Sequence, residues 1–212
     1  MTDIAIIDYG MGNLLSVSKA FEHVAPQAKV TVTSDPAIIR TAAKVVFPGV
    51  GAMADCIREL DSRGLTEAVK TAAAGKPFLG ICLGMQALFD HSEEGDCAGL
   101  GILPGQVRLF PPEAMHDTAG NKLKVPHIGW NEVRHARAHP LWNGISDDER
   151  FYFVHSYYCD PVDRAVVVGT ARYPFEFACA VARDNLFAVQ FHPEKSAAAG
   201  LRLLANFVTW KP

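Results

Sequence analysis

Apolar residues along the first ninety positions follow two different periods. Short apolar runs rich in β-branched residues are typical of buried strands, and they occur at residues 3–8, 29–33 and 45–47. Apolar residues recur at helical spacing in between, at Leu14, Val17, Phe21 and Val24, and further helices are predicted within 36–42 and 52–74. Because strands and helices alternate with short turns, the pattern predicts a parallel sheet with helices on both faces.

After about residue 99 the pattern changes to short β-like runs separated by turn residues such as Asn143-Gly144. These runs cover residues 106–110, 130–134, 151–158, 165–171, 178–183 and 186–191. The turns between them favour antiparallel pairing. A final helix is expected after Ser196, a suitable cap, with Leu201, Leu204 and Val208 on one face. The predicted fold class is α/β: an open and mostly parallel sheet flanked by helices, with an additional antiparallel strand section in the C-terminal half. Residues 1–212 are expected to form a single domain.

Composition narrows the function classes. Hydrophobic residues make up 49% of the 212 residues, so a substantial core can form, and a formal net charge of −3 gives no basic excess for binding nucleic acid. The N-terminus lacks the positive segment of a signal peptide, and the longest apolar run, residues 45–54, is shorter than the roughly 20 residues of a membrane span. We expect a soluble, cytoplasmic protein that binds neither nucleic acid nor membrane.

The chain contains five cysteines, which are Cys56, Cys82, Cys97, Cys159 and Cys179. Their odd number, without a C-x-x-C pair or a Cys/His zinc spacing, argues against a disulfide framework and against a zinc site. Most of them are expected to be buried small hydrophobic residues. Neither a metal nor a cofactor is predicted.

Residues 76–86 hold the most informative pattern. An apolar strand runs into a Gly-Ile-Cys-Leu-Gly turn centred on Cys82, and a helical pattern follows in Met85, Leu88 and Phe89. This is the thiol counterpart of the Gly-x-Ser-x-Gly motif, in which a strained strand-to-helix turn raises a nucleophile above the sheet. At the start of a helix Cys82 would be favoured as a thiolate, and the N–H of Leu83 would point at an oxyanion formed by attack on a carbonyl. The alternative is a buried cysteine at a glycine-punctuated strand end.

A second candidate motif, His192-Pro193-Glu194, follows another strand near the C-terminus. A thiolate nucleophile needs a group that moves protons, and that group needs a partner that fixes its tautomer. His192 is the candidate base and acid, Glu194 is the candidate orienting carboxylate, and Pro193 stiffens the pair. An isolated His-x-Glu can also be a surface turn. A zinc deaminase is excluded, because its H-x-E motif requires a downstream P-C-x-x-C and no cysteine follows Cys179.

Residues 45–51 form a strand that ends in the glycine-rich turn Pro48-Gly49-Val50-Gly51. Its position after a parallel strand places it at the sheet edge where ligands bind in open α/β folds. Backbone N–H groups there could supply a second oxyanion donor, and a simple turn is the alternative. Gly10-Met11-Gly12 reaches the same edge but is no dinucleotide-binding fingerprint, because Leu15 stands where the third glycine should fall.

Together, the segments Pro48–Gly51, Gly80–Gln86 and His192–Glu194 resemble the class I, triad-type glutamine amidotransferases. Further segments are similar to the glutaminase subunits of imidazole glycerol phosphate synthase, from histidine biosynthesis, and these are Ile7–Asn13, Pro126–Asn131, Tyr152–Tyr157 and Gln190–Ser196. The resemblance covers essentially the whole chain, with no departure at a catalytic position. It is loosest at residues 111–124, which are expected to decorate the surface.

The resemblance implies an enzyme that hydrolyses glutamine to glutamate and ammonia through a cysteinyl thioester. The implied catalytic residues are Cys82, His192 and Glu194; the implied oxyanion hole is Val50, Gly51 and Leu83; the implied glutamine-binding residues are Gly49, Gln86, Glu94, Ser156 and Tyr157. Glu94 suits the α-ammonium group of the substrate, and Gln86 lies one helical turn past Cys82. A solvated acidic turn is the alternative for Glu94, and ordinary strand positions are the alternative for Ser156 and Tyr157.

The resemblance also implies a partner, a (β/α)8-barrel cyclase subunit that consumes the ammonia and forms imidazole glycerol phosphate within a heterodimer. Candidate contacts are Asn13, Tyr152, Phe153 and Lys195, of which Asn13 and Lys195 could equally be exposed caps or turns. The alternative enzymes are the glutaminase of another synthase, such as the one that makes pyridoxal phosphate, a cysteine peptidase and a γ-glutamyl hydrolase. The alternative outside enzymes is a catalytically silent regulatory subunit, against which the intact triad argues.

Overall fold

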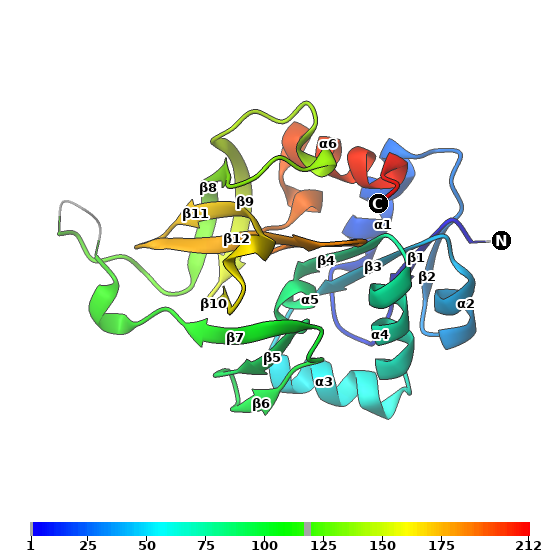
Figure 1. Ribbon diagram of the computed structural model, residues 1–212, viewed down its shortest axis with the longest axis horizontal. Helices are drawn as coiled ribbons and strands as arrows, with labels where there is room; N and C mark the ends of the chain where they lie inside the picture. The colour runs from blue at the N-terminus through cyan, green and yellow to red at the C-terminus, as the bar shows by residue number, and fades with distance from the viewer. Residues whose placement is uncertain (1, 117–119) are drawn as a thin grey trace.

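The computed structural model describes residues 2–116 and 120–212 of the chain. A large sheet runs through the molecule in the order β2-β1-β3-β4-β13-β12-β10-β7-β5-β6, and helices cover it on both sides (Figure 1). The first five strands of this order are parallel, and they are β2 (Val30–Thr33), β1 (Ile4–Ile7), β3 (Lys44–Gly49), β4 (Phe78–Cys82) and β13 (Leu186–Val189). The predicted α/β fold with an open sheet is therefore confirmed.

The two faces of the parallel strands pack against different helices, because successive side chains of a strand point to opposite faces. Ile4 and Ile6 of β1 belong to a cluster with α1 (Leu14–Val24) and α6 (Ala197–Thr209), whose rings Phe21 and Phe207 lie 6.1 Å apart. Ile7 faces the other way, into a cluster with the three remaining long helices, which are α2 (Pro36–Thr41), α3 (Met53–Ser62) and α4 (Thr66–Gly75).

The second half of the chain adds the expected antiparallel strands, which extend away from the two chain ends (Figure 1). Beyond β13 the sheet continues antiparallel through β12 (Glu176–Arg183), β10 (Tyr157–Pro161) and β7 (Leu103–Leu109). A branch leaves β12 antiparallel through β11 (Val167–Arg172), β8 (His127–His135) and β9 (Glu149–His155). The sheet also includes the short strands β5 (Phe89–Ser92) and β6 (Cys97–Ala98), which the sequence pattern did not predict.

Two predicted elements differ from the observed ones. Residues 151–158 were expected to form one strand, but Ser156 separates β9 from β10, because the chain there stops pairing with β8 and starts pairing with β7. The helix expected through Leu88 and Phe89 is only the single turn α5 (Leu83–Gln86). It ends because the carbonyl of Leu88 accepts hydrogen bonds from the N–H groups of Ile102 and Leu103, which draws the chain into β5.

Short 3-10 turns occupy Pro112–Ala114, Pro140–Trp142, Arg164–Val166 and Pro193–Lys195. The segment 111–124 was expected to decorate the surface, and most of its described residues are exposed, although Met115 is buried in the core. Residues 117–119 lie outside the described residues. Among the described residues, no helix is both long and apolar enough to cross a bilayer. The carboxyl ends of β3, β4 and β13 meet at one edge of the sheet, and the candidate site lies there.

Candidate active site

Cys82 is the last residue of β4 and adopts φ 54° and ψ −111°, a backbone conformation that non-glycine residues rarely take. Such a conformation costs on the order of 1–3 kcal/mol, and strained residues of this kind cluster at active sites. Gly84 allows α5 to lie directly against β3, because a Cβ at this position would overlap the carbonyl oxygen of Phe47. Gly80 has a similar role, since a Cβ there would come within 2.9 Å of the Ala188 Cβ. The predicted strained turn from strand to helix is therefore present.

His192 and Glu194 follow β13 and form a buried pair. The Nδ1 of His192 lies 2.9 Å from Oε1 of Glu194, and their side chains are only 2% and 1% exposed. Ser196 holds the backbone of this segment, since its Oγ donates to the His192 carbonyl at 2.6 Å and accepts from the Tyr152 N–H at 3.0 Å. Ser196 precedes α6, as predicted, but its side chain makes no capping hydrogen bond to that helix.

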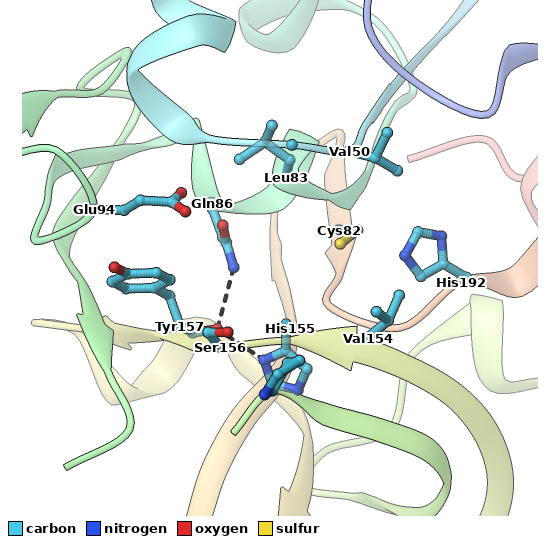
Figure 2. Close-up of a pocket in the computed structure, with 12 residues that line it drawn as sticks. Val50, Cys82, Leu83, Gln86, Glu94, Val154, His155, Ser156, Tyr157 and His192 are labelled. Carbon is cyan, nitrogen blue, oxygen red and sulfur yellow. Dashed lines mark hydrogen bonds between the residues drawn. The ribbon is translucent and has the colours of Figure 1, made fainter. Parts of the chain in front are cut away.

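The protonation of His192 depends on its neighbours. Burial alone would lower the pKa of His192, but the interactions with Cys82 and then with Glu194 outweigh burial and raise this pKa to about 10. The raised pKa favours the cationic imidazole of His192 at neutral pH. The ring of His192 lies beside the Cys82 sulfur (Figure 2), and its Nε2 has no hydrogen-bond partner among the described residues. This nitrogen is thus available to a reacting group.

A cleft of about 290 Å³ opens over Cys82 (Figure 2). The candidate residues that line it with Cys82 are Val50, Gly51, Leu83, Gln86, Glu94, Ser156, Tyr157 and His192. Gly49 does not line the cleft; it is buried beside Cys82 in the sheet register, where a Cβ would overlap the Tyr9 hydroxyl. The candidate substrate and oxyanion residues other than Gly49 therefore surround one cavity.

Glu94 is half-buried and is more than the solvated residue of an acidic turn. Its Oε2 accepts a hydrogen bond from the N–H of Met53 at 2.8 Å, at the start of α3. The same side chain lines the cleft beside Tyr157 (Figure 2). A negative charge is thus fixed at the end of the cleft that lies away from His192.

Two glutamine side chains extend from the cleft wall to the sulfur. The Nε2 of Gln86 donates to the Tyr157 carbonyl at 3.2 Å and to Oε1 of Gln190 at 3.1 Å. The Nε2 of Gln190 in turn donates to the sulfur of Cys82 at 3.7 Å. Gln190 was not predicted as a site residue, although a polar residue within the apolar run 186–191 was the available signal.

His155 also lines the cleft and was not predicted as a site residue. Its Nδ1 lies 2.8 Å from the Tyr157 carbonyl oxygen, and its Nε2 lies 2.9 Å from Nδ1 of His127. Both histidines are buried, and burial lowers the pKa of His155 to about 3 and that of His127 to about 4. The alternation of Phe151, Phe153 and His155 placed His155 on the buried face of its strand.

The four candidate partner contacts lie in different environments. Phe153 is fully buried among aromatic rings, so its side chain cannot contact a partner, and that part of the prediction is wrong. Lys195 is exposed, and its ammonium group lies 5.8 Å from the centre of the half-buried Tyr152 ring. Tyr152 also contacts Trp130, which is 48% exposed. Asn13 is half-buried immediately before α1.

The remaining cysteines differ from Cys82. Cys56, Cys159 and Cys179 are buried, and burial raises the pKa of each thiol, in the case of Cys56 to about 12. This confirms the expectation that most of the cysteines are small core residues. Cys97 is half-buried, and its pKa is raised by burial and then by neighbouring carboxylates.

Comparison with known proteins gives one family. The model of the family "Glutamine amidotransferase class-I" matches residues 5–210. The chain is 67% identical to the imidazole glycerol phosphate synthase subunit HisH of Thiobacillus denitrificans, over 99% of this chain and 92% of that one. It is 65% identical to the subunit of the same name from Nitrosospira multiformis, over the full length of both.

Solved structures agree in fold at low sequence identity. A crystal structure of a glutamine amidotransferase superposes with a TM-score of 0.70 at 15% identity, covering 96% of each chain. The structure of PurLQS from Thermotoga maritima gives a TM-score of 0.67 at 17% identity, covering 98% of each chain.

Proposed function

Because the chain belongs to the class-I glutamine amidotransferase family, we propose that it is the glutaminase subunit of an imidazole glycerol phosphate synthase, which supplies ammonia for histidine biosynthesis. The observation that carries the proposal is the position of Cys82 and His192 at one cleft, with the buried carboxylate of Glu194 at hydrogen-bond distance, 2.9 Å, from Nδ1 of His192. The chain acts as one glutamine amidotransferase domain, in the cytoplasm, within a heterodimer.

In the first half of the reaction, the Cys82 thiolate attacks the side-chain carboxamide carbon of glutamine. The C=O electron pair moves to oxygen, and the N–H groups of Leu83 and of the Val50–Gly51 turn stabilise this oxyanion. His192 passes its Nε2 proton to the amide nitrogen, the C–N bond breaks, and ammonia leaves. A glutamyl thioester remains on Cys82.

In the second half, neutral His192 removes a proton from water, which attacks the thioester carbonyl. Collapse of the second oxyanion breaks the C–S bond and releases glutamate, and the proton stays on His192 opposite the restored thiolate. Glu194 fixes the imidazole orientation through Nδ1 and stabilises its cationic form in both halves.

The cleft orients glutamine by charge. Glu94 receives the substrate's α-ammonium group, since its carboxylate is fixed by the Met53 N–H at the far end of the cavity. Gln86 lies between that carboxylate and the sulfur (Figure 2), and Ser156 and Tyr157 line the same cleft, through which the rest of the substrate passes. Gly49 acts beneath the cleft, by allowing the close approach of Tyr9 and Leu83.

Ammonia is useful only if it reaches its acceptor before it is protonated in water. We infer that a (β/α)8-barrel cyclase subunit covers the cleft and receives the ammonia. Tyr152, Lys195 and Asn13 are the proposed contacts, and the half-exposed Trp130 beside Tyr152 extends this surface.

The test is ammonia release from glutamine by the wild type and by Cys82→Ala, each with and without the cyclase subunit and its ligand. We expect low turnover by the wild type alone, a rise when the liganded cyclase binds, and no turnover by Cys82→Ala in either state. Equal wild-type turnover with and without the cyclase would refute the coupling, and an active Cys82→Ala would refute the mechanism. γ-Glutamyl peptides serve as the control substrate, because a γ-glutamyl hydrolase or a cysteine peptidase would cleave them.

A further inference from the structure

A continuous chain of polar groups connects the buried face of the β8–β9 pair to the sulfur of Cys82. It runs from Asn131 through His127 and His155 to the Tyr157 carbonyl, and from there through Gln86 and Gln190 to the sulfur. The donor and the acceptor of each hydrogen bond in this polar series follow from the main-chain carbonyl oxygens within it, because a carbonyl oxygen can only accept.

The Tyr157 carbonyl oxygen determines how the two glutamine amides are turned. A carbonyl only accepts hydrogen bonds, so the Gln86 atom that faces it must be the amide nitrogen. The second hydrogen of that nitrogen points at Gln190, so the Gln190 atom that faces Gln86 must be its oxygen. The remaining atom of the Gln190 amide is its N–H donor, and it faces the sulfur of Cys82 at 3.7 Å.

The same carbonyl fixes the histidine end of the chain. His155 must carry its proton on Nδ1, which lies 2.8 Å from the Tyr157 oxygen. Its Nε2 then accepts from Nδ1–H of His127, whose own Nε2 faces the amide nitrogen of Asn131 at 3.4 Å. That nitrogen is identified in the same way, because it also donates to the Arg172 carbonyl at 3.0 Å. Both imidazoles must be neutral, which agrees with the low pKa that burial gives each of them.

We propose that Gln190 is a further catalytic residue, whose buried amide N–H stabilises the Cys82 thiolate, and that Gln86 and His155 are positioning residues that keep this amide turned toward the sulfur. Gln190 is 0% exposed, so its amide is shielded from water, whereas Cys82 is 7% exposed and faces the cleft. A hydrogen bond to a charged acceptor is stronger than one to a neutral acceptor, and the donor therefore favours the reactive form of the thiol. The inference rests on the proposed role of Cys82 as the nucleophile.

Two variants of Gln190 separate the effect of the N–H donor on the sulfur from the effect of side-chain packing. Gln190→Glu keeps the shape and the acceptor for Gln86 but turns a carboxylate oxygen toward the sulfur. Gln190→Met keeps the length and removes the donor. Gln106→Glu on β7 is the matched control, because Gln106 is exposed and does not line the cleft.

The first measurement is the rate at which iodoacetamide alkylates Cys82 at neutral pH, resolved by peptide mass spectrometry from the half-buried Cys97. We expect about a tenfold slower reaction in Gln190→Met and a still slower one in Gln190→Glu, with no change in Gln106→Glu. The second is glutamine turnover in the cyclase complex, where kcat should fall by a similar factor while KM stays within about twofold, since Gln190 contacts the sulfur and does not line the cleft.

The proposal would be overturned if Gln190→Met were alkylated and turned over glutamine at the wild-type rates. If only Gln190→Glu folds, its alkylation at the wild-type rate would overturn the proposal in the same way. A rise in KM with unchanged kcat and unchanged alkylation would also overturn it, by assigning Gln190 to substrate binding. Because alkylation requires no glutamine, a wild-type protein without glutaminase activity would refute the proposed function and still leave the donation to Cys82 measurable.

Discussion

Replacing Glu194 by glutamine removes one negative charge from the most buried part of the site and leaves its shape unchanged. The amide oxygen can still accept the His192 N–H that Glu194 Oε1 accepts at 2.9 Å. Both side chains are almost fully buried, at 2% and 1% exposure, so water cannot replace the lost charge. The variant therefore isolates the electrostatic contribution of the carboxylate to the state of His192.

The expected magnitude follows from that burial. The interactions with Cys82 and Glu194 together overcome burial and hold the pKa of His192 at about 10. Breaking a buried charged pair costs about 3–5 kcal/mol, and we expect the lower end because the hydrogen bond is kept. Because the proposed reaction starts from the state in which His192 is cationic, destabilising that state by about 3 kcal/mol raises the barrier by up to the same amount, which corresponds to roughly a hundredfold lower kcat.

The assay is glutamate formation at saturating glutamine, with the cyclase and its ligand bound. Glu67→Gln is the control, since Glu67 is an exposed carboxylate on α4. KM should change by less than about threefold, because Glu194 does not line the cleft. A Glu194→Gln enzyme that retains kcat within about threefold of the wild type would refute the role assigned to this carboxylate.

Two further predictions concern stability. Gly84→Ala should lower the free energy of unfolding by about 3 kcal/mol, because the new Cβ overlaps the Phe47 carbonyl oxygen. Gly75→Ala should change this free energy by less than about 1 kcal/mol, because no heavy atom lies within 4 Å of the new Cβ. Urea unfolding of both variants measures the difference, and equal midpoints would contradict the prediction. His127 and His155 have a lower pKa in the folded state, about 4 and about 3, than the ordinary value of 6.5, so their contribution to stability is complete above pH 6.5 and is lost as the pH falls toward these values. Between pH 7.5 and pH 5 the free energy of unfolding should fall by about 2 kcal/mol for each histidine. Urea unfolding at both pH values measures this loss. If a variant with both histidines replaced by glutamine lost as much stability over this pH range as the wild type, these residues would not be responsible.

Much of the site could be predicted because its parts are short, local patterns. The turn around Cys82 needs small residues at 80 and 84, and the structure shows a main-chain oxygen or a methyl group directly over each. His192 and Glu194 are two residues apart, so their pairing depends on one turn of backbone. The parallel arrangement of β1, β2, β3 and β4 was predictable for the same reason, since helices join these strands in turn.

The features that were missed depend on distant parts of the chain. The helix after Cys82 stops after one turn because residues 102 and 103 bond to the Leu88 carbonyl, and no local signal marks that contact. Phe153 is the exception, because a local signal was overlooked: strand alternation with Phe151 turns its side chain inward, away from the predicted partner surface. Gln190 meets the sulfur only because β13 lies beside β4 in the sheet, a pairing between residues more than a hundred positions apart.

Acylation of Cys82 by glutamine is the step on which every other assignment depends. Peptide mass spectrometry of the cyclase complex, quenched with acid during turnover, measures it directly. The account predicts a glutamyl group on the peptide that contains Cys82, and none on the peptides of Cys56, Cys97, Cys159 or Cys179. Ammonia release at the full rate with an unmodified Cys82, or with the glutamyl group on another cysteine, would contradict it.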